Sequence, residues 1–345
     1  MNQTTTPELR ASFKHVLAFE VAKATLVTRV LPSGVEATIP NTAAAVRRLI
    51  DKQVLANATL NLGPLLVVCE ATGSYDRHIL EATSDLAVAC HRAHGSRMRS
   101  YAKYRGKRAK TDPIDVRLIG EFGRDTPDLA LYRKPTPAKA ELRALVARRT
   151  ELDQARAAEQ ARLDHTQSKL VAASIRRQIK SLEKDIATIE AALEKLVAAD
   201  AELDTDTHLM RSVVGIGFIS AVAILAYVPE LGSIGRGTVA ALAGLAPYDD
   251  ASGTHDGIRH IAGGRLEARH ALYMAAVTAI THNPHLKDLA DRIKAKGRPP
   301  KVAITAVMRK LLTMLNAIVR DGKPCKMPTA ARQEKKAGPT RAILT

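Results

Sequence analysis

Cysteine and aromatic residues are scarce in this chain of 345 residues. Its three cysteines, Cys69, Cys90 and Cys325, form no CxxC pair, which argues against a disulfide scaffold or a cysteine-based zinc site. Such sparing use of cysteine is typical of a reducing cytoplasm, where we expect this protein to act. Aromatic residues make up 3% of the sequence and tryptophan is absent, so unpaired bases would find few rings on which to stack.

We expect neither a signal peptide nor a membrane span in this sequence. Glu8, Arg10 and Lys14 precede any apolar run, unlike the start of a secretory signal. Residues 212–229 carry no charge, but the stretch is short for a membrane span, and Gly215-Ile216-Gly217 interrupts its start. We therefore expect a buried helix after a glycine turn here, and no membrane partner.

Positive charge is abundant and clustered. The formal net charge is +17, and residues 291–345 contain fourteen Lys and Arg against three acids. Residues 91–110 contain no acid and eight basic residues, namely Arg92, Arg97, Arg99, Lys103, Arg105, Lys107, Arg108 and Lys110. One basic run is usually a solvated face, but two runs on a basic chain favour a nucleic acid as partner. We expect all of these run residues except Arg92 to contact DNA or RNA.

The first 134 residues show the pattern of an α/β domain, which we expect to span residues 12–134. Buried strands are predicted at 15–22, 24–31, 35–39, 64–69 and 86–90, with helices at 42–55, from about Asp76 and from Asp112. Three successive strands followed by alternating helices and strands predict a mixed sheet covered by helices.

The rest of the chain is predicted to be largely helical. Pro135 and Pro137 mark a boundary, after which residues 135–205 form a long helical segment. Apolar residues recur in it at alternating steps of four and three: Ile175, Ile179, Leu182, Ile186, Ile189, Leu193 and Leu196. This seam predicts a coiled coil, within the chain or between chains, although a helix lying on its own domain is the alternative. We expect a mostly α domain at 206–327 and a disordered basic tail at 328–345.

Four acids have positions that suggest chemistry. Glu20 lies in the first predicted strand, Glu70 closes the apolar run 65–69, and Asp112 and Asp115 are three residues apart at a predicted helix start. A carboxylate in a buried strand is costly unless it is paired or binds a cation. Carboxylates that converge from strand ends and a helix can hold two Mg²⁺ ions, which clamp the attacking and leaving oxygens of a phosphodiester. An N-cap is the plainer interpretation of Asp112 alone.

The order of several short motifs resembles the DEDD transposases of the insertion-sequence family numbered one hundred and ten, which are related to the Piv DNA invertases. The matching segments are Phe19-Glu20-Val21-Ala22-Lys23, Cys69-Glu70-Ala71-Thr72-Gly73, Lys110-Thr111-Asp112-Pro113-Ile114-Asp115, Gly215-Ile216-Gly217, Gly244-Leu245-Ala246-Pro247 and Ser252-Gly253. The resemblance covers residues 14–320 and implies a RuvC-like, ribonuclease-H-type fold for the N-terminal domain. Glu20 departs from the family, which normally has aspartate there, and this puts full activity in question.

The resemblance also implies a mechanism and partners. In this family the residue that matches Ser252 is the proposed nucleophile, which forms a covalent phosphoserine link with DNA, while the four acids hold Mg²⁺. Arg259, Arg265 and Arg269 follow the serine and would hold phosphates, unless they are simply solvated. The family further implies a structured non-coding bridge RNA as guide and a homo-oligomer, a dimer or tetramer joined through the long helices.

Two other functions remain open from the sequence. A RuvC-like nuclease would use the same metal ions with an activated water and would not need Ser252. A non-catalytic nucleic-acid-binding protein, derived from a decayed copy of the element, would explain the departure at Glu20.

Overall fold

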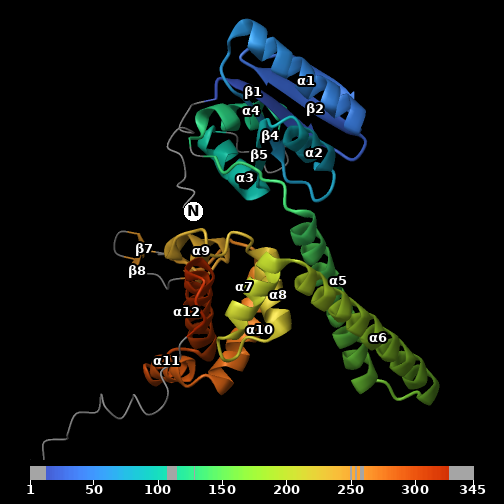
Figure 1. The fold of residues 1–345 in the computed structure, drawn as a ribbon, viewed down its shortest axis with the longest axis vertical. Helices are drawn as coiled ribbons and strands as arrows, with labels where there is room; N and C mark the ends of the chain where they lie inside the picture. The colour runs from blue at the N-terminus through green and yellow to red at the C-terminus, as the bar shows by residue number, and fades with distance from the viewer. Residues whose placement is uncertain are drawn as a thin grey trace, which may run out of the picture. The chain divides into compact units, whose positions relative to one another are not determined.

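The computed structural model describes residues 13–106, 115–127, 129–248, 251–252, 255–256 and 260–325, and for 251–252 and 255–256 it describes the backbone alone. The chain divides into two compact units, Met1–Lys134 and Pro135–Thr345 (Figure 1). The first is mixed α/β and the second is mostly helical. The predicted tail at 328–345 lies outside the described residues.

A five-stranded sheet forms the centre of the N-terminal unit. Its strands are β1 (His15–Val21), β2 (Thr25–Leu31), β3 (Glu36–Pro40), β4 (Leu65–Glu70) and β5 (Ala89–Ala93). They lie in the order β3-β2-β1-β4-β5. The pairs β1/β2 and β2/β3 are antiparallel, whereas β1/β4 and β4/β5 are parallel. The carboxyl ends of β1, β4 and β5 therefore meet at one edge of the sheet.

Helices cover both faces of this sheet. They are α1 (Ala43–Leu60), α2 (Arg77–Asp85), α3 (Gly95–Tyr104) and α4 (Val116–Asp125). Side chains of a strand alternate between its faces. Accordingly Leu17 and Phe19 of β1 pack in a cluster with residues of α1 and α2, whereas Val16 and Ala18 pack with residues of α3 and α4.

Helix α4 lies unusually close to the sheet because a glycine faces the strands. A Cβ added at Gly123 would come within 2.6 Å of Val68 Cγ2 and 3.2 Å of Val16 Cγ1. Ordinary carbon–carbon contacts are about 3.5–4.0 Å. A helix with any side chain at position 123 would have to lie further away, so this glycine sets the depth at which α4 sits on β1 and β4.

Three local predictions for this unit are wrong. Leu86 and Val88 do not begin a strand: Leu86 caps α2, and Ala87 has a left-handed φ of 52°, so β5 starts only at Ala89. Residues 95–104, expected only as a basic run, form α3, whose start is capped by the His94 side chain. Helix α4 begins at Val116 rather than at Asp112, and Asp115 is its N-cap; Asp112 lies outside the described residues.

The second unit begins with a helical hairpin. Helices α5 (Pro137–Asp164) and α6 (Lys169–Ala199) pack against each other and are joined by a short loop (Figure 1). Ile175, Ile179 and Leu193 of the apolar seam are buried. An ion pair of 2.9 Å joins Arg149 Nε of α5 to Glu190 Oε1 of α6. The seam thus lies against a neighbour within the same chain, while a supercoil and a pairing between chains stay predictions.

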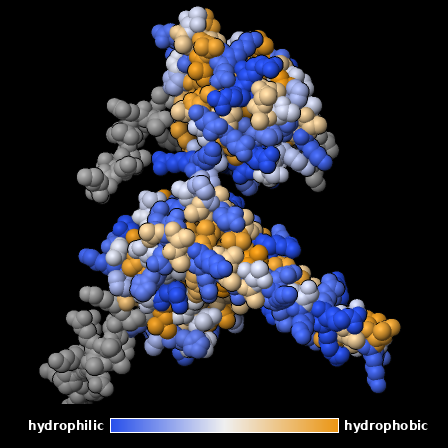
Figure 2. Space-filling view, turned by 45° about the vertical axis from the view of Figure 1, so that its right-hand side comes forward, coloured by the Kyte–Doolittle hydropathy of each residue, from blue (hydrophilic) through white to orange (hydrophobic). Residues whose placement is uncertain are grey.

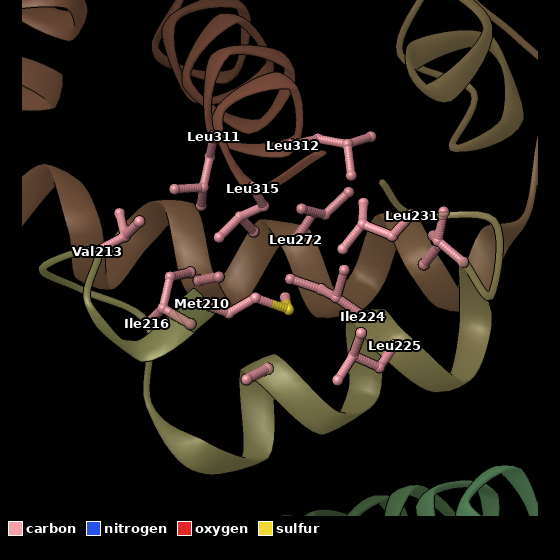
Figure 3. Close-up of a cluster of buried hydrophobic side chains, with 14 of the residues drawn as sticks. Met210, Val213, Ile216, Ile224, Leu225, Leu231, Leu272, Leu311, Leu312 and Leu315 are labelled. Carbon is pink, nitrogen blue, oxygen red and sulfur yellow. The ribbon is translucent and has the colours of Figure 1, made fainter. Parts of the chain in front are cut away.

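The remaining helices build one apolar core. They are α7 (Ala201–Arg211), α8 (Phe218–Tyr227), α9 (Arg236–Leu242), α10 (Leu266–His282), α11 (Pro284–Ala295) and α12 (Pro300–Asp321). Figure 3 shows Met210, Leu272 and Leu311 converging from α7, α10 and α12. By length and composition α12 could cross a membrane, but its buried face, which includes Leu312 and Leu315, packs in this core. A core helix of a soluble protein can have the same length and apolar composition, so these two properties are weak support for a membrane span.

Four very short strands lie between α9 and α10. They are β6 (Pro247–Tyr248), β7 (Ala251–Ser252), β8 (His255–Asp256) and β9 (His260–Ile261). Strand β6 pairs with β9, and β7 pairs with β8, both antiparallel. Ser252 therefore lies on one of two paired short strands.

Candidate active site

Glu20 and Glu70 lie on the same face of the sheet, at the ends of neighbouring parallel strands. The register pairs Ala18 with Val68 and Phe19 with Cys69, and one further step brings Glu20 opposite Glu70. Both positions share the face of Val16 and Leu66, which α3 and α4 cover. Because neighbouring strands are about 4.8 Å apart, the two carboxylates start from adjacent points of the sheet edge.

Asp115 approaches the same place from the start of α4. Its Oδ1 accepts a hydrogen bond of 2.7 Å from the backbone N–H of Arg117, so the side chain is held as the helix N-cap. Burial raises the pKa of Glu20, and the negative charges of Asp115 and then Glu70 raise it further, while the backbone N–H of Val116 lowers it. Glu20 therefore lies within electrostatic reach of both other acids, and the cluster carries unfavourable like-charge repulsion.

The Glu70 carboxylate extends toward the start of α3. A Cβ added at Gly95 would lie 3.2 Å from Glu70 Oε1 and 3.7 Å from Arg99 Nη1, so both side chains pass over this glycine. Arg99 is exposed. A carboxylate and a guanidinium thus both lie beside Gly95, where β4 ends and α3 begins.

The described side chains do not yet form a closed metal site. Among residues 13–106, 115–127, 129–248 and 260–325, no three Asp, Glu, His or Cys side chains are arranged to hold a metal ion. Asp112, the fourth predicted acid, lies outside the described residues. What the structure brings together is therefore three carboxylates in one region, with all-oxygen donors of the kind that Mg²⁺ prefers.

Ser252 belongs to the other unit and sits in the hairpin between α9 and α10. Its backbone pairs with that of His255 in the β7/β8 ladder. The base of this hairpin needs glycine: Gly244 has a φ of +64°, and a Cβ on it would lie 2.1 Å from the carbonyl oxygen of Gly263. Two chain segments therefore cross in direct backbone contact at the base, which fixes where the hairpin leaves the helical core.

Two parts of this chain match models of known protein families. Residues 29–172 match the DEDD transposase family model for IS110 elements, described as Transposase, and residues 207–291 match a second model, described as Transposase IS116/IS110/IS902 family. The first match runs from the end of β2 to the start of α6, and the second runs from α7 to α11 and includes the Ser252 hairpin. The chain belongs to the IS110 family of transposases. It is accordingly a DNA transposase or recombinase.

Individual relatives agree with this assignment. The transposase is 28% identical over 273 residues to pilin gene-inverting proteins of Moraxella lacunata and Moraxella bovis, which covers 76% of this chain and 83% of each relative. It is 29% identical over 133 residues to an uncharacterized 43.6 kDa protein of insertion element IS110 from Streptomyces coelicolor, covering 38% of this chain and 33% of that protein.

The predicted nucleic-acid-binding residues of the transposase's first unit differ in their surroundings. Arg97, Arg99 and Lys103 are exposed on α3, with the Arg97 guanidinium 5.7 Å from the centre of the Phe122 ring. Arg105 is also exposed, but it pairs with Glu121 of α4 at 2.8 Å. Three others, Lys107, Arg108 and Lys110, lie outside the described residues.

Two arginines predicted to hold phosphates, Arg265 and Arg269, have partners within the protein, and their contact with phosphate stays a prediction. Arg265 forms a two-pronged ion pair with Glu230, at 2.6 and 2.7 Å, and donates to the carbonyl oxygen of Tyr227 at 3.0 Å. Arg269 donates to the carbonyl oxygens of Gly263 at 2.9 Å and Gly244 at 3.3 Å. Both fasten the base of the Ser252 hairpin to the helical core. The third, Arg259, lies outside the described residues, as do Asp249 and Asp250.

Sequence reasoning missed the residues that hold the Glu70 turn. The Arg92 guanidinium donates to the buried carboxylate of Asp76 and, at 3.0 Å, to the carbonyl oxygen of Gly73. Asn41 donates through its side chain to two loop carbonyls, while the neighbouring Thr42 caps α1. The spacing of Asp76 and Arg92 on successive elements offers a weak signal for their pairing; nothing in the sequence marks Asn41.

Proposed function

We propose that this transposase cuts and rejoins DNA by phosphoryl transfer that depends on divalent metal ions held by Glu20, Glu70, Asp112 and Asp115. The supporting observation is that Glu20 and Glu70 occupy adjacent strand ends on one face while Asp115 enters the same region from α4. The strand order β3-β2-β1-β4-β5, with β1, β2 and β3 antiparallel and β1, β4 and β5 parallel, is consistent with the proposed RuvC-like, ribonuclease-H-type fold and supports the same proposal.

The residues present suit Mg²⁺, most simply two ions. Their donors are all carboxylate oxygens, and the repulsion felt by Glu20 is what a cation between the acids would relieve. The bound ions would stabilise negative charge on the attacking and leaving oxygens at the phosphate. Glu20 and Glu70 would supply donors from the sheet, and Asp115 would supply a donor from the start of α4. Glu20 is one methylene longer than aspartate and has the reach to take part.

Ser252 is the proposed nucleophile. Its hydroxyl oxygen would bond to the phosphorus of a DNA phosphodiester while one phosphorus–oxygen bond to a sugar breaks. The serine proton would leave to a nearby base, and the departing sugar oxygen would take up a proton. Attack by a hydroxyl of another DNA end on the phosphoserine would release Ser252 and complete the rejoining. The number of phosphodiester bonds is conserved, so no outside energy source is required.

Trapping of the covalent intermediate tests this proposal. Donor DNA with an end label is incubated with Mg²⁺ and the full-length protein, and labelled protein is counted after denaturation. We expect an adduct with the wild type and with Ser233→Ala, a serine of the same unit in an exposed turn. We expect none with Ser252→Ala. An equal adduct yield from Ser252→Ala contradicts the assignment.

A RuvC-like nuclease is the alternative use of the same acids. It would cleave DNA through an activated water, without a covalent adduct. Cleavage by both wild type and Ser252→Ala, with no adduct from either, would establish that function instead. Activity that survives both Mg²⁺ chelation and Asp112→Ala would remove both enzyme mechanisms and favour a nucleic-acid-binding element copy.

A structured non-coding bridge RNA is the proposed guide, alongside DNA as the substrate. Support comes from the exposed cations of α3, Arg97, Arg99 and Lys103, in a run of twenty residues that has no acid. Recombination of a donor plasmid should be lost when the non-coding flanks of the element are deleted and should return when the flank is transcribed from a second plasmid. Full activity of purified protein on flankless DNA without RNA would contradict this.

We also propose a homo-oligomer, a dimer or tetramer, that joins through the α5–α6 hairpin. Figure 2 shows hydrophobic side chains at the tip of this hairpin, where Leu170 and Val171 are 80% and 48% exposed. Strand exchange requires two DNA ends to be held together, which two protomers would do. Light scattering of the purified chain should give a multiple of 37.2 kDa that falls to the monomer in Leu170→Lys; an unchanged mass in the variant would rule out the tip as the contact.

A further inference from the structure

Asn41 connects the two loops that follow the strands of Glu20 and Glu70. It lies between β3 and α1, and its side-chain amide Nδ2 donates to the carbonyl oxygen of Ala22 and to that of Tyr75, both at 2.9 Å. Ala22 is two residues beyond Glu20, and Tyr75 is five residues beyond Glu70. One NH₂ group therefore spans two segments that no backbone hydrogen bond of the sheet joins at this point.

The backbone of Asn41 strengthens this connection. Its N–H donates to the carbonyl oxygen of Ala24 at 2.9 Å, on the other side of the same β1–β2 turn. Both the main chain and the side chain thus hold the turn after Glu20. The amide Oδ1 is buried without a hydrogen-bond partner among the described atoms. An unpaired buried oxygen is unfavourable. The position of the Asn41 amide is therefore determined by the two hydrogen bonds that its NH₂ group donates.

The turn after Glu70 is held from its other side as well. Arg92 of β5 donates to the carbonyl oxygen of Gly73 and pairs with Asp76, which ties the segment 73–76 to β5, whereas Asn41 ties Tyr75 to the turn after β1. Without Asn41 the turn would remain attached to β5 but would lose its link to the β1 side. The loops after Glu20 and Glu70 would then lose the side chain that joins them, and the distance between the two carboxylates would be less well fixed.

We propose that Asn41 is a positioning residue that sets the separation of Glu20 and Glu70 and thereby tunes the affinity of the carboxylate cluster for divalent cations. This rests on the proposed metal-dependent function. Groups that orient metal ligands without touching the metal commonly change affinity by about 10–100-fold when they are removed. Asn41 has that relation to both strand-borne acids, since it contacts their loops and neither carboxylate is among its hydrogen-bond partners.

The experiment measures Mn²⁺ binding to the full-length chain without DNA, from the electron paramagnetic resonance signal of the free ion. Asn41→Leu removes both donors at similar size, and Asn41→Ser keeps one hydroxyl that is too short to reach both carbonyls. Thr42→Ala is the matched control, because Thr42 caps α1 through the N–H of Ala45 and contacts neither loop. We expect Mn²⁺ affinity to fall about tenfold in both Asn41 variants and to change less than threefold in Thr42→Ala. If Asn41→Leu does not fold, as judged by circular dichroism, Asn41→Ser decides the outcome.

A fourth variant separates the two proposals. If Glu70→Gln binds Mn²⁺ as the wild type does, the proposed metal site is wrong. If Glu70→Gln abolishes binding while the folded Asn41 variants bind within threefold of Thr42→Ala, the metal site stands and the role of Asn41 is overturned. Weakened binding in the Asn41 variants and near-normal binding in Thr42→Ala would support it.

Discussion

Two glycines on the same helix, Gly120 and Gly123 of α4, should respond in opposite ways to replacement by alanine. A Cβ at Gly123 would lie 2.6 Å from Val68 Cγ2, about 1 Å closer than ordinary contact. Branching at Cβ restricts the side-chain torsion of valine also in a strand, so Val68 can turn away only at a cost. A Cβ at Gly120 would lie 3.3 Å from Leu31 Cδ1, the movable end of a flexible side chain, and 3.5 Å from Ala18 Cβ.

The size of the competing free-energy terms decides whether each substitution stabilises or destabilises the protein. Replacing glycine by alanine inside a helix gains about 1 kcal/mol from helix propensity. Overpacking a tight core contact costs about 1–3 kcal/mol. The gain should prevail at position 120, so Gly120→Ala is neutral or stabilising. The penalty should prevail at position 123, so Gly123→Ala destabilises the sheet unit and lifts the start of α4, with Asp115, away from Glu20.

Differential scanning calorimetry of the full-length variants measures this contrast, and Mn²⁺ titration reports on the displaced helix start. We expect the transition of the N-terminal unit to fall in Gly123→Ala, with weaker Mn²⁺ binding, and to stay or rise in Gly120→Ala. Equal shifts in the two variants, or a stabilised Gly123→Ala, would refute the idea that Gly123 sets the depth of α4.

Two further predictions concern the helical unit. Burial alone would raise the pKa of Glu230, but the ion pair with Arg265 lowers it below the ordinary value of 4.5. The ion pair therefore stabilises the folded protein above pH 4.5, and this stabilisation is lost as the pH falls through the lowered pKa of Glu230. Arg265→Leu should thus lower the free energy of unfolding at pH 7 by about 1 kcal/mol, once solvent screening of the partly exposed pair is allowed for. Urea unfolding at several pH values should show that the difference in unfolding free energy between variant and wild type shrinks below pH 4.5. A difference that stays constant with pH would contradict this prediction. Asn316, which accepts from Gly232 N–H at 2.8 Å and donates to Ile234 O at 2.9 Å, fixes the loop before α9. Asn316→Leu would leave two backbone groups unpaired and should cost about 2–4 kcal/mol in the same assay, whereas an effect below 0.5 kcal/mol would speak against this role.

Much of the fold could be predicted from the hydrophobic patterns of the sequence. The uninterrupted apolar runs of β1 and β4 predicted buried strands, and the α4-side position of Glu20 and Glu70 follows from simple alternation along them. Family motifs then led to an assignment that the comparisons confirm. The helical content of the second part was likewise predictable from its composition and periodicity.

The failures have physical causes. Leu86 and Val88 are apolar enough for a strand, but the left-handed backbone at Ala87 turns the chain between them, and tertiary packing decides such cases. Two-residue strands around Ser252 are too short to produce a periodic signal. Arg265 has the residue type of a phosphate ligand, and only the fold reveals that Glu230 is its partner. Asn41 bridges carbonyls 19 and 34 residues away in sequence, a relation that no local pattern encodes.

Recombination in cells of a donor plasmid that carries the whole element with its flanks tests the central claim most directly. The comparison is between Glu70→Gln, which removes one charge at nearly constant shape, and Glu121→Gln, which changes a carboxylate of α4 that pairs with Arg105. We predict that Glu70→Gln abolishes recombination while the protein remains folded, and that Glu121→Gln recombines within a few-fold of the wild type. Recombination by a folded Glu70→Gln protein at the wild-type level would contradict a reaction centred on the clustered acids.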